Sequence, residues 1–85
     1  MTHTIPDSLT LGDKVRAVRK SLGLTQPQLA LAAGVGVRFV VELEAGKPTL
    51  RFELVLRVIH ALGGVLFLDF GGDDLGDSNG SRVNG

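Results

Sequence analysis

Residues 26–45 read QPQLALAAGVGVRFVVELEA, and this stretch decides the fold of the chain. It holds two runs of helix-forming residues separated by little more than Gly34 and Gly36. A glycine at position 34 permits a turn conformation that a β-carbon would oppose. The stretch predicts a helix-turn-helix, with Ala30 as the small residue where the two helices cross. The apolar residues expected to point at one core are Leu29, Ala33, Val35, Val40 and Leu43.

One further helix is predicted on each side of this stretch, which makes the chain all-α. The first should begin near Thr10, a favourable cap, and end at Gly23. The last should span residues 50–62, with Thr49 as its cap. Apolar residues occupy most of the circumference of this last helix, and a chain of 85 residues has little to cover them with. We therefore expect a second subunit to pack against it.

Residues 65–70, VLFLDF, are rich in β-forming side chains, but the chain offers no second strand to pair with them. A lone exposed strand is unstable, and pairing with the same strand of a two-fold-related copy would remove the open edge. The sequence thus predicts a homodimer held together by the last helix and this short C-terminal β-strand. The expected interface residues are Phe52, Leu56, Val65, Leu66, Phe67, Leu68 and Phe70.

The predicted organisation has four parts. Residues 1–9 form a flexible arm, residues 10–64 the helical domain, residues 65–70 the dimerisation strand and residues 71–85 a disordered acidic tail. The net charge is zero, but residues 1–60 carry eight basic and five acidic side chains, a balance of +3. The remaining residues carry one basic and four acidic side chains, a balance of −3. A basic body of this kind favours a nucleic-acid partner.

The composition excludes several kinds of site. The chain has no cysteine, which removes disulfides, cysteine-ligated zinc and a thiol nucleophile, and its two histidines are far apart in sequence. No nucleophile, base and acid combine into a catalytic set, so we expect no enzyme, no cofactor and no metal. The acidic tail resembles a calcium loop in composition but lacks the EF-hand spacing. With no secretory signal and no long apolar run, the default expectation is a cytoplasmic protein that does not enter a membrane.

Residues 11–64 resemble the Cro/phage-repressor-like (XRE) helix-turn-helix family, whose fold is a lambda-repressor-like bundle of four to five helices. The landmarks that carry the resemblance are Leu24-Thr25-Gln26, Leu29-Ala30, Gly34-Val35, Leu43-Glu44 and Gly46-Lys47. Within that family, RFVVELEAGKPT followed by a helix, a double glycine and an apolar strand looks most like the HipB-type antitoxins. The resemblance implies a small dimer that binds a palindromic operator, represses its own operon and neutralises a HipA-like kinase toxin.

The resemblance also implies roles for individual residues. Gln26 matches a residue that contacts a DNA phosphate and supports the recognition helix, and Arg19 with Glu44 matches a structural ion pair. The positions that match base-facing residues are Val37, Arg38, Phe39 and Glu42. The positions that match phosphate contacts are Lys47, Thr49 and Arg51. The family often has serine where this chain has Gly36, which is a weaker cap for the recognition helix.

The sequence leaves alternatives open. Phe39 could belong to the core, or it could contact thymine methyl groups together with Val37. Glu42 could form an internal ion pair, or it could accept a hydrogen bond from a cytosine amino group. The chain could regulate transcription without a toxin partner. It could also serve only protein contacts, on a helix-turn-helix scaffold that has lost DNA binding.

Overall fold

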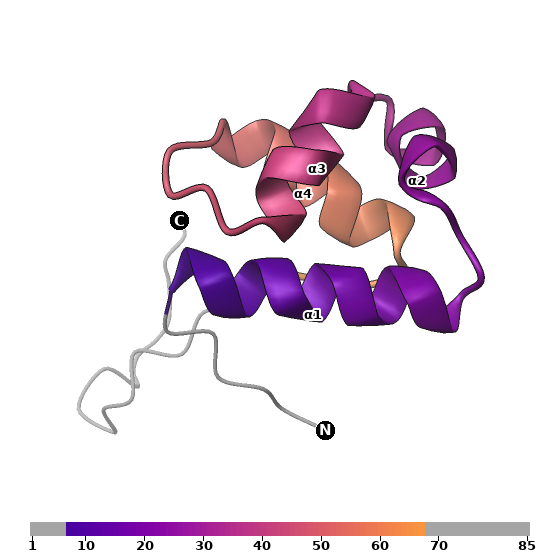
Figure 1. Ribbon diagram of the computed structural model, residues 1–85, viewed down its shortest axis with the longest axis horizontal. Helices are drawn as coiled ribbons and strands as arrows, with labels where there is room; N and C mark the ends of the chain where they lie inside the picture. The colour runs from indigo at the N-terminus through magenta and orange to yellow at the C-terminus, as the bar shows by residue number, and fades with distance from the viewer. Residues whose placement is uncertain (1–6, 68–85) are drawn as a thin grey trace, which may run out of the picture.

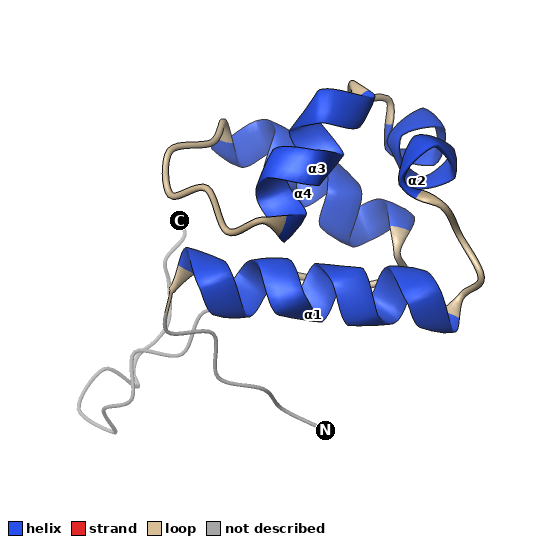
Figure 2. Cartoon of the chain, viewed as in Figure 1, coloured by secondary structure: helices blue, strands red, loops and turns tan. Residues whose placement is uncertain are grey.

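The computed structural model describes residues 7–67, and these residues form four α-helices (Figures 1 and 2). The helices are α1 (Ser8–Ser21), α2 (Gln26–Ala33), α3 (Val37–Glu44) and α4 (Phe52–Ala61). In the view of Figure 1, α1 runs along the lower edge of the domain and the other helices lie above it. None of these four helices has the length and apolar character needed to cross a membrane. The prediction of an all-helical helix-turn-helix domain is confirmed.

The predicted C-terminal strand is not seen in the part of the chain that the structure describes. Residues 65–67 have no regular secondary structure there, and residues 68–70 lie outside the described range, with Leu68 and Phe70 among them. Residues 1–6 of the predicted arm and all of the predicted tail, residues 71–85, also lie outside it. Since the predicted strand would pair with a second copy, it stays a prediction.

Helix α1 begins at Ser8, two residues before the cap that the sequence suggested. The carboxylate of Asp7 accepts a hydrogen bond from the backbone N–H of Thr10 at 2.9 Å, so Asp7 is the N-cap and Thr10 lies within the helix. This backbone hydrogen bond lowers the pKa of Asp7. The Ser8 hydroxyl donates a hydrogen bond to the carbonyl oxygen of Gly46 at 2.8 Å, which ties the start of α1 to the end of α3.

The turn between α2 and α3 follows the predicted pattern. Thr25 and Gln28 form a capping box at the start of α2, in which each side chain accepts a hydrogen bond from the backbone N–H of the other residue. Gly34 ends α2 with a φ of 72°, in the left-handed region, and the N–H of Val35 donates to the carbonyl oxygen of Ala30. The two helices are thereby set at a fixed angle.

Six apolar side chains form the buried core of the described residues. Helix α3 packs against both α1 and α2, and α4 packs against α2, so the recognition helix predicted by the sequence is held from two sides. The buried residues are Val15, Leu29, Ala30, Val40, Leu43 and Val58. Partly buried side chains, among them Ala33, Val35 and Phe39, pack around this core.

Helix α1 passes close to the end of α3 at Gly12, which is buried. A β-carbon at this position would lie 2.5 Å from the carbonyl oxygen of Leu43 and 2.8 Å from that of Glu44. Both distances are shorter than real β-carbon contacts, and both involve backbone atoms that cannot rotate away. The absence of a side chain at Gly12 is therefore what lets the two helices cross.

Helix α4 begins later than the sequence suggested. Its N-cap is Arg51, which makes no capping hydrogen bond through its side chain, and its first residue is Phe52. Thr49, the predicted cap, is exposed in the loop that joins α3 to α4. The first helical hydrogen bonds of α4 run from the N–H groups of Leu54 and Val55 to the carbonyl oxygen of Arg51, two residues after Thr49.

Candidate nucleic-acid interface

The outward face of α3 carries three exposed side chains at helical spacing. Val37 and Val41 are each 43% exposed, and Arg38 is exposed beside Val37. Arg38 makes no ion pair within residues 7–67, so its guanidinium group is available to another molecule. A short rigid helix that presents one cation between two apolar side chains is suited to reading base edges, where arginine recognises guanine and apolar groups contact thymine methyls.

Phe39 and Glu42, the other two predicted base-facing residues, are only half-exposed. Phe39 is partly buried and packs against the core. It lies on the side of α3 between the exposed face that carries Arg38 and the buried face that carries Val40. Sequence matching to the family missed Val41, although it lies one helical turn after Val37 and one turn separates residues of the same face. A count of helical positions from Val37 would have found it.

A buried ion pair fixes α3 to α1. Arg19 donates two hydrogen bonds to the carboxylate of Glu44, from Nε to Oε2 at 2.6 Å and from Nη2 to Oε1 at 3.0 Å. The side chains are 9% and 4% exposed, so the pair is shielded from water. Nη1 of Arg19 donates to the carbonyl oxygen of Leu24 at 2.8 Å. One guanidinium group thus holds α1, the loop before α2 and the end of α3 in place.

Gln26, the predicted phosphate contact, joins the same network. Its Nε2 donates to Oε1 of Glu44 at 3.1 Å, so the first residue of α2 is oriented by the last residue of α3. Burial of Glu44 raises the pKa of its carboxyl group, but the hydrogen bonds from Arg19 and Gln26 and the charges of Arg19 and Arg16 outweigh this effect and leave the pKa below its ordinary value. The hydrogen bonds to Glu44 also raise the pKa of Arg19.

A shallow hollow opens beside this network, between α1, α2 and α3. It is lined by Arg16, Gln26, Val41, Glu44 and Ala45. Arg16 is exposed on α1 at its rim, so a second cation lies on the same side of the domain as the exposed face of α3. Nothing in the sequence around Arg16 indicates that its side of the first helix borders α3.

The loop between α3 and α4 holds the predicted phosphate contacts, and two of them are paired with carboxylates. The ammonium group of Lys47 lies 3.5 Å from Oε1 of Glu42. Nη2 of Arg51 lies 3.0 Å from Oε2 of Glu53, in a pair whose two side chains are mostly exposed. Thr49, between them in sequence, is exposed. The structure therefore brings Lys47 and Glu42, two candidate DNA contacts, against each other.

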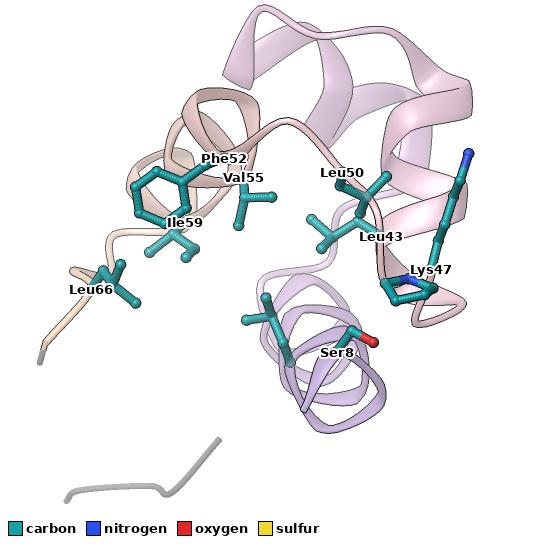
Figure 3. A pocket seen from close by; sticks show the side chains of 10 residues that line it. Ser8, Leu43, Lys47, Leu50, Phe52, Val55, Ile59 and Leu66 are labelled. Carbon is teal, nitrogen blue, oxygen red and sulfur yellow. The ribbon is translucent and has the colours of Figure 1, made fainter. Parts of the chain in front are cut away.

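An apolar surface lies on α4 and the residues that follow it. Phe52 is 62% exposed, and Val65, Leu66 and Phe67 are all exposed as well, while Leu56 is half-buried. A hollow of about 160 Å³ opens beside them; Figure 3 shows Phe52, Ile59 and Leu66 near one another on its α4 side, with Ser8 and Leu43 across from them. These residues include every predicted dimer contact that lies within the described range.

Within residues 7–67, no group of acidic and histidine side chains is placed to hold a metal ion. The chain has no cysteine to add to such a group.

Comparisons with known proteins agree with this geometry. A family model described as Helix-turn-helix matches residues 15–68. An uncharacterized HTH-type transcriptional regulator of Sinorhizobium fredii, y4mF, is 49% identical over 63 residues, which are 74% of this chain and 83% of that protein. The crystal structure of the clp gene regulator ClgR from C. glutamicum is 33% identical, with a TM-score of 0.63, over 74% of this chain and 85% of that one.

Two solved complexes of HipB also share the fold. In the complex with the O4 20mer, HipB matches with a TM-score of 0.75 over 84% of this chain and all of its own. A HipB variant in complex with the O2 20mer matches with a TM-score of 0.76 over 85% of this chain and all of its own. Both are 18% identical in sequence to this chain, so the likeness is one of fold.

Proposed function

This chain belongs to the helix-turn-helix family, and we propose that it is a sequence-specific DNA-binding repressor that acts on its own operon. The observation that carries the proposal is the outward face of α3, where Arg38 stands exposed between Val37 and Val41. The buried pair of Arg19 and Glu44 supports this face from behind and fixes its angle to the rest of the domain. A rigid helix with this face fits the width of the DNA major groove.

In the proposed complex, α3 lies in the major groove with Arg38 on a guanine and with Val37 and Val41 against thymine methyl groups. Gln26 holds one phosphate through its side-chain amide and its own backbone N–H at the start of α2, where a helix N-terminus favours an anion. Lys47, Thr49 and Arg51 contact the backbone from the loop before α4. These phosphate contacts supply most of the affinity and make binding fall steeply with salt.

The active form in this proposal is a homodimer on a palindromic operator. The exposed apolar surface on α4 and residues 65–67 supports this proposal, because a chain of this size gains little by exposing Phe52, Val65 and Phe67 to water. Residues 65–70 would then form a strand with the same residues of the second copy. Two-fold symmetry would place the two α3 helices roughly 34 Å apart, which is one turn of DNA.

A narrower proposal is that the repressor is the antitoxin of a HipBA-like module and binds a HipA-like kinase. Support comes from the residues 38–49, RFVVELEAGKPT, that resemble HipB-type antitoxins and from the HipB-like fold. Co-expression with the product of the neighbouring reading frame tests it. Rescue of growth and a stable complex with a kinase would support the antitoxin, whereas a regulator with no toxin partner would give neither.

The DNA-binding proposal is tested by fluorescence anisotropy with the gene's own upstream DNA and a scrambled duplex of equal length, over a series of salt concentrations. We expect selective binding with two chains per duplex and a steep loss of affinity as salt rises. Arg38→Ala should abolish most of the selectivity. Lys14→Ala, two positions before Arg16 and so on the opposite side of α1, serves as a variant with the same loss of charge. Equal and weak binding of both duplexes by the wild-type chain would refute the proposal.

A further inference from the structure

The end of α3 places Glu42 and Lys47 side by side through its backbone. The N–H of Lys47 donates to the carbonyl oxygen of Glu42 at 3.0 Å, and the N–H of Gly46 donates to that of Leu43 at 3.1 Å. This is the Schellman pattern, and it requires the left-handed φ of 86° that Gly46 adopts. An apolar contact commonly joins the two outer residues of the motif. In this chain they are a carboxylate and an ammonium group.

The side chains of Lys47 and Glu42 form an ion pair, and both are partly exposed to water. Nζ of Lys47 lies 3.5 Å from Oε1 of Glu42, and the two side chains are 46% and 34% exposed. Because water screens such a pair, the attraction between Lys47 and Glu42 is weak, and a DNA phosphate can replace Glu42 as the partner of Lys47. Arg38, by contrast, has no carboxylate partner within residues 7–67. Of these two cations near the groove, only Lys47 must first give up an internal partner.

We propose that Glu42 is a specificity-determining residue, which holds Lys47 in this internal pair and releases it to a phosphate only on a matching DNA site. The inference rests on the proposed function. On a matching site, the freed carboxylate of Glu42 accepts a hydrogen bond from a base amino group in the groove. On any other sequence the pair stays closed, and Lys47 is not available to a phosphate. Binding to non-matching DNA is therefore weakened more than binding to the operator.

The test uses the full-length chain and a double-mutant cycle. Glu42→Gln, Lys47→Gln and the double variant are titrated into the upstream and the scrambled duplex by fluorescence anisotropy. We expect Glu42→Gln to bind the scrambled duplex about two- to five-fold more tightly, the range of an exposed ion pair. We expect a smaller gain on the upstream duplex, so that selectivity falls. In the Lys47→Gln background, Glu42→Gln should give no such gain, because there is no cation to release.

Asp13→Asn is the matched control, since Asp13 is exposed on α1 and loses the same charge. It should change the affinity for either duplex by less than Glu42→Gln does, and thermal unfolding should show that all variants are folded. A gain of Glu42→Gln that persists without Lys47, a gain of equal size on both duplexes, or no gain at all would overturn the inference. A wild-type chain that does not select the upstream duplex would instead refute the proposed function, whatever Glu42 does.

Discussion

Arg19 and Glu44 lie 25 positions apart in sequence and form a buried two-bond fork, with Nε and Nη2 of the arginine donating to the two carboxylate oxygens at 2.6 and 3.0 Å. Glu44 also accepts from Gln26, at the start of α2. The last residue of the proposed recognition helix is thus bound to the two helices before it. Changes at this pair should affect the fold first and DNA binding through it.

We expect Glu44→Gln to destabilise the fold by about 3 kcal/mol, because it leaves the guanidinium group of Arg19 buried without its counter-charge. Urea unfolding followed by circular dichroism measures this difference. Glu53→Gln, which breaks the exposed pair with Arg51, should change the unfolding free energy by less than about 1 kcal/mol. Equal effects of the two substitutions would contradict the role assigned to the buried pair.

The lowered pKa of Glu44 gives stability a defined dependence on pH. Its carboxyl group binds a proton less readily in the folded chain than in the unfolded chain. Its contribution to the unfolding free energy is therefore complete above about pH 5 and is lost as pH falls through the lowered pKa. Unfolding experiments between pH 7 and pH 3 should show this loss. The unfolding free energy of the Glu44→Gln variant should fall less steeply over the same range. An unchanged slope would contradict the contribution assigned to Glu44.

Gly12→Ala should destabilise the domain by about 2 kcal/mol, because the new β-carbon would press on the carbonyl oxygens of Leu43 and Glu44. Helix propensity alone predicts the opposite sign, a gain of up to about 1 kcal/mol. A lower melting temperature of Gly12→Ala in thermal unfolding would therefore support the steric effect, and a higher one would support helix propensity. Asp13→Ala, one position along on the exposed side of α1, is the control and should change stability by less than about 0.5 kcal/mol.

Val41→Ala should weaken binding of the upstream duplex about five-fold, which corresponds to about 1 kcal/mol, and leave the scrambled duplex almost unaffected. The reason is that the substitution removes an exposed apolar side chain, which in the proposed complex contacts a base and not a phosphate. Leu31→Ala is a suitable control, since Leu31 is 85% exposed on α2. Anisotropy titrations measure both variants. An equal loss on the two duplexes would place Val41 outside the base-reading surface.

Phe52→Lys should convert the proposed dimer into monomers with little effect on the fold, because Phe52 is 62% exposed in the isolated chain. Analytical ultracentrifugation measures the mass, and circular dichroism checks the helices. Leu31→Lys introduces the same charge at another exposed apolar residue and should leave the mass unchanged. A dimer that survives Phe52→Lys would show that the subunits meet elsewhere. Leu66→Lys combined with Leu68→Lys tests the predicted strand in the same assay.

The sequence was sufficient for the four helices and the turn between α2 and α3, because apolar spacing and the glycine at position 34 act locally. It was less reliable at helix starts. Asp7 and Thr10 are both good caps, and only the structure shows that Asp7 caps α1. Thr49 is also a good cap, yet α4 begins at Phe52, after the loop that contains Pro48. Competing caps differ in energy by too little for sequence to rank them.

Contacts between distant positions explain the rest. Nothing around Gly12 in sequence indicates that the end of α3 crosses there. Lys47 and Glu42 are five positions apart, which is not a spacing of one helical face, and the turn at Gly46 brings them together. Arg19 and Glu44 were identified only by resemblance to a family, since their pairing depends on how two helices pack. The predicted strand, which would pair with another molecule, remains a prediction.

The small core of the domain has a consequence for how long a subunit survives. With six buried apolar side chains among residues 7–67, the free-energy difference between the folded and the unfolded chain is small. Any molecule that binds only the folded chain adds to that difference by mass action, and a second subunit and a stretch of DNA would both do so. A chain bound to neither a second subunit nor DNA would unfold more often and would therefore be degraded faster by proteases. The lifetime of the protein would then report how many of its DNA sites are occupied.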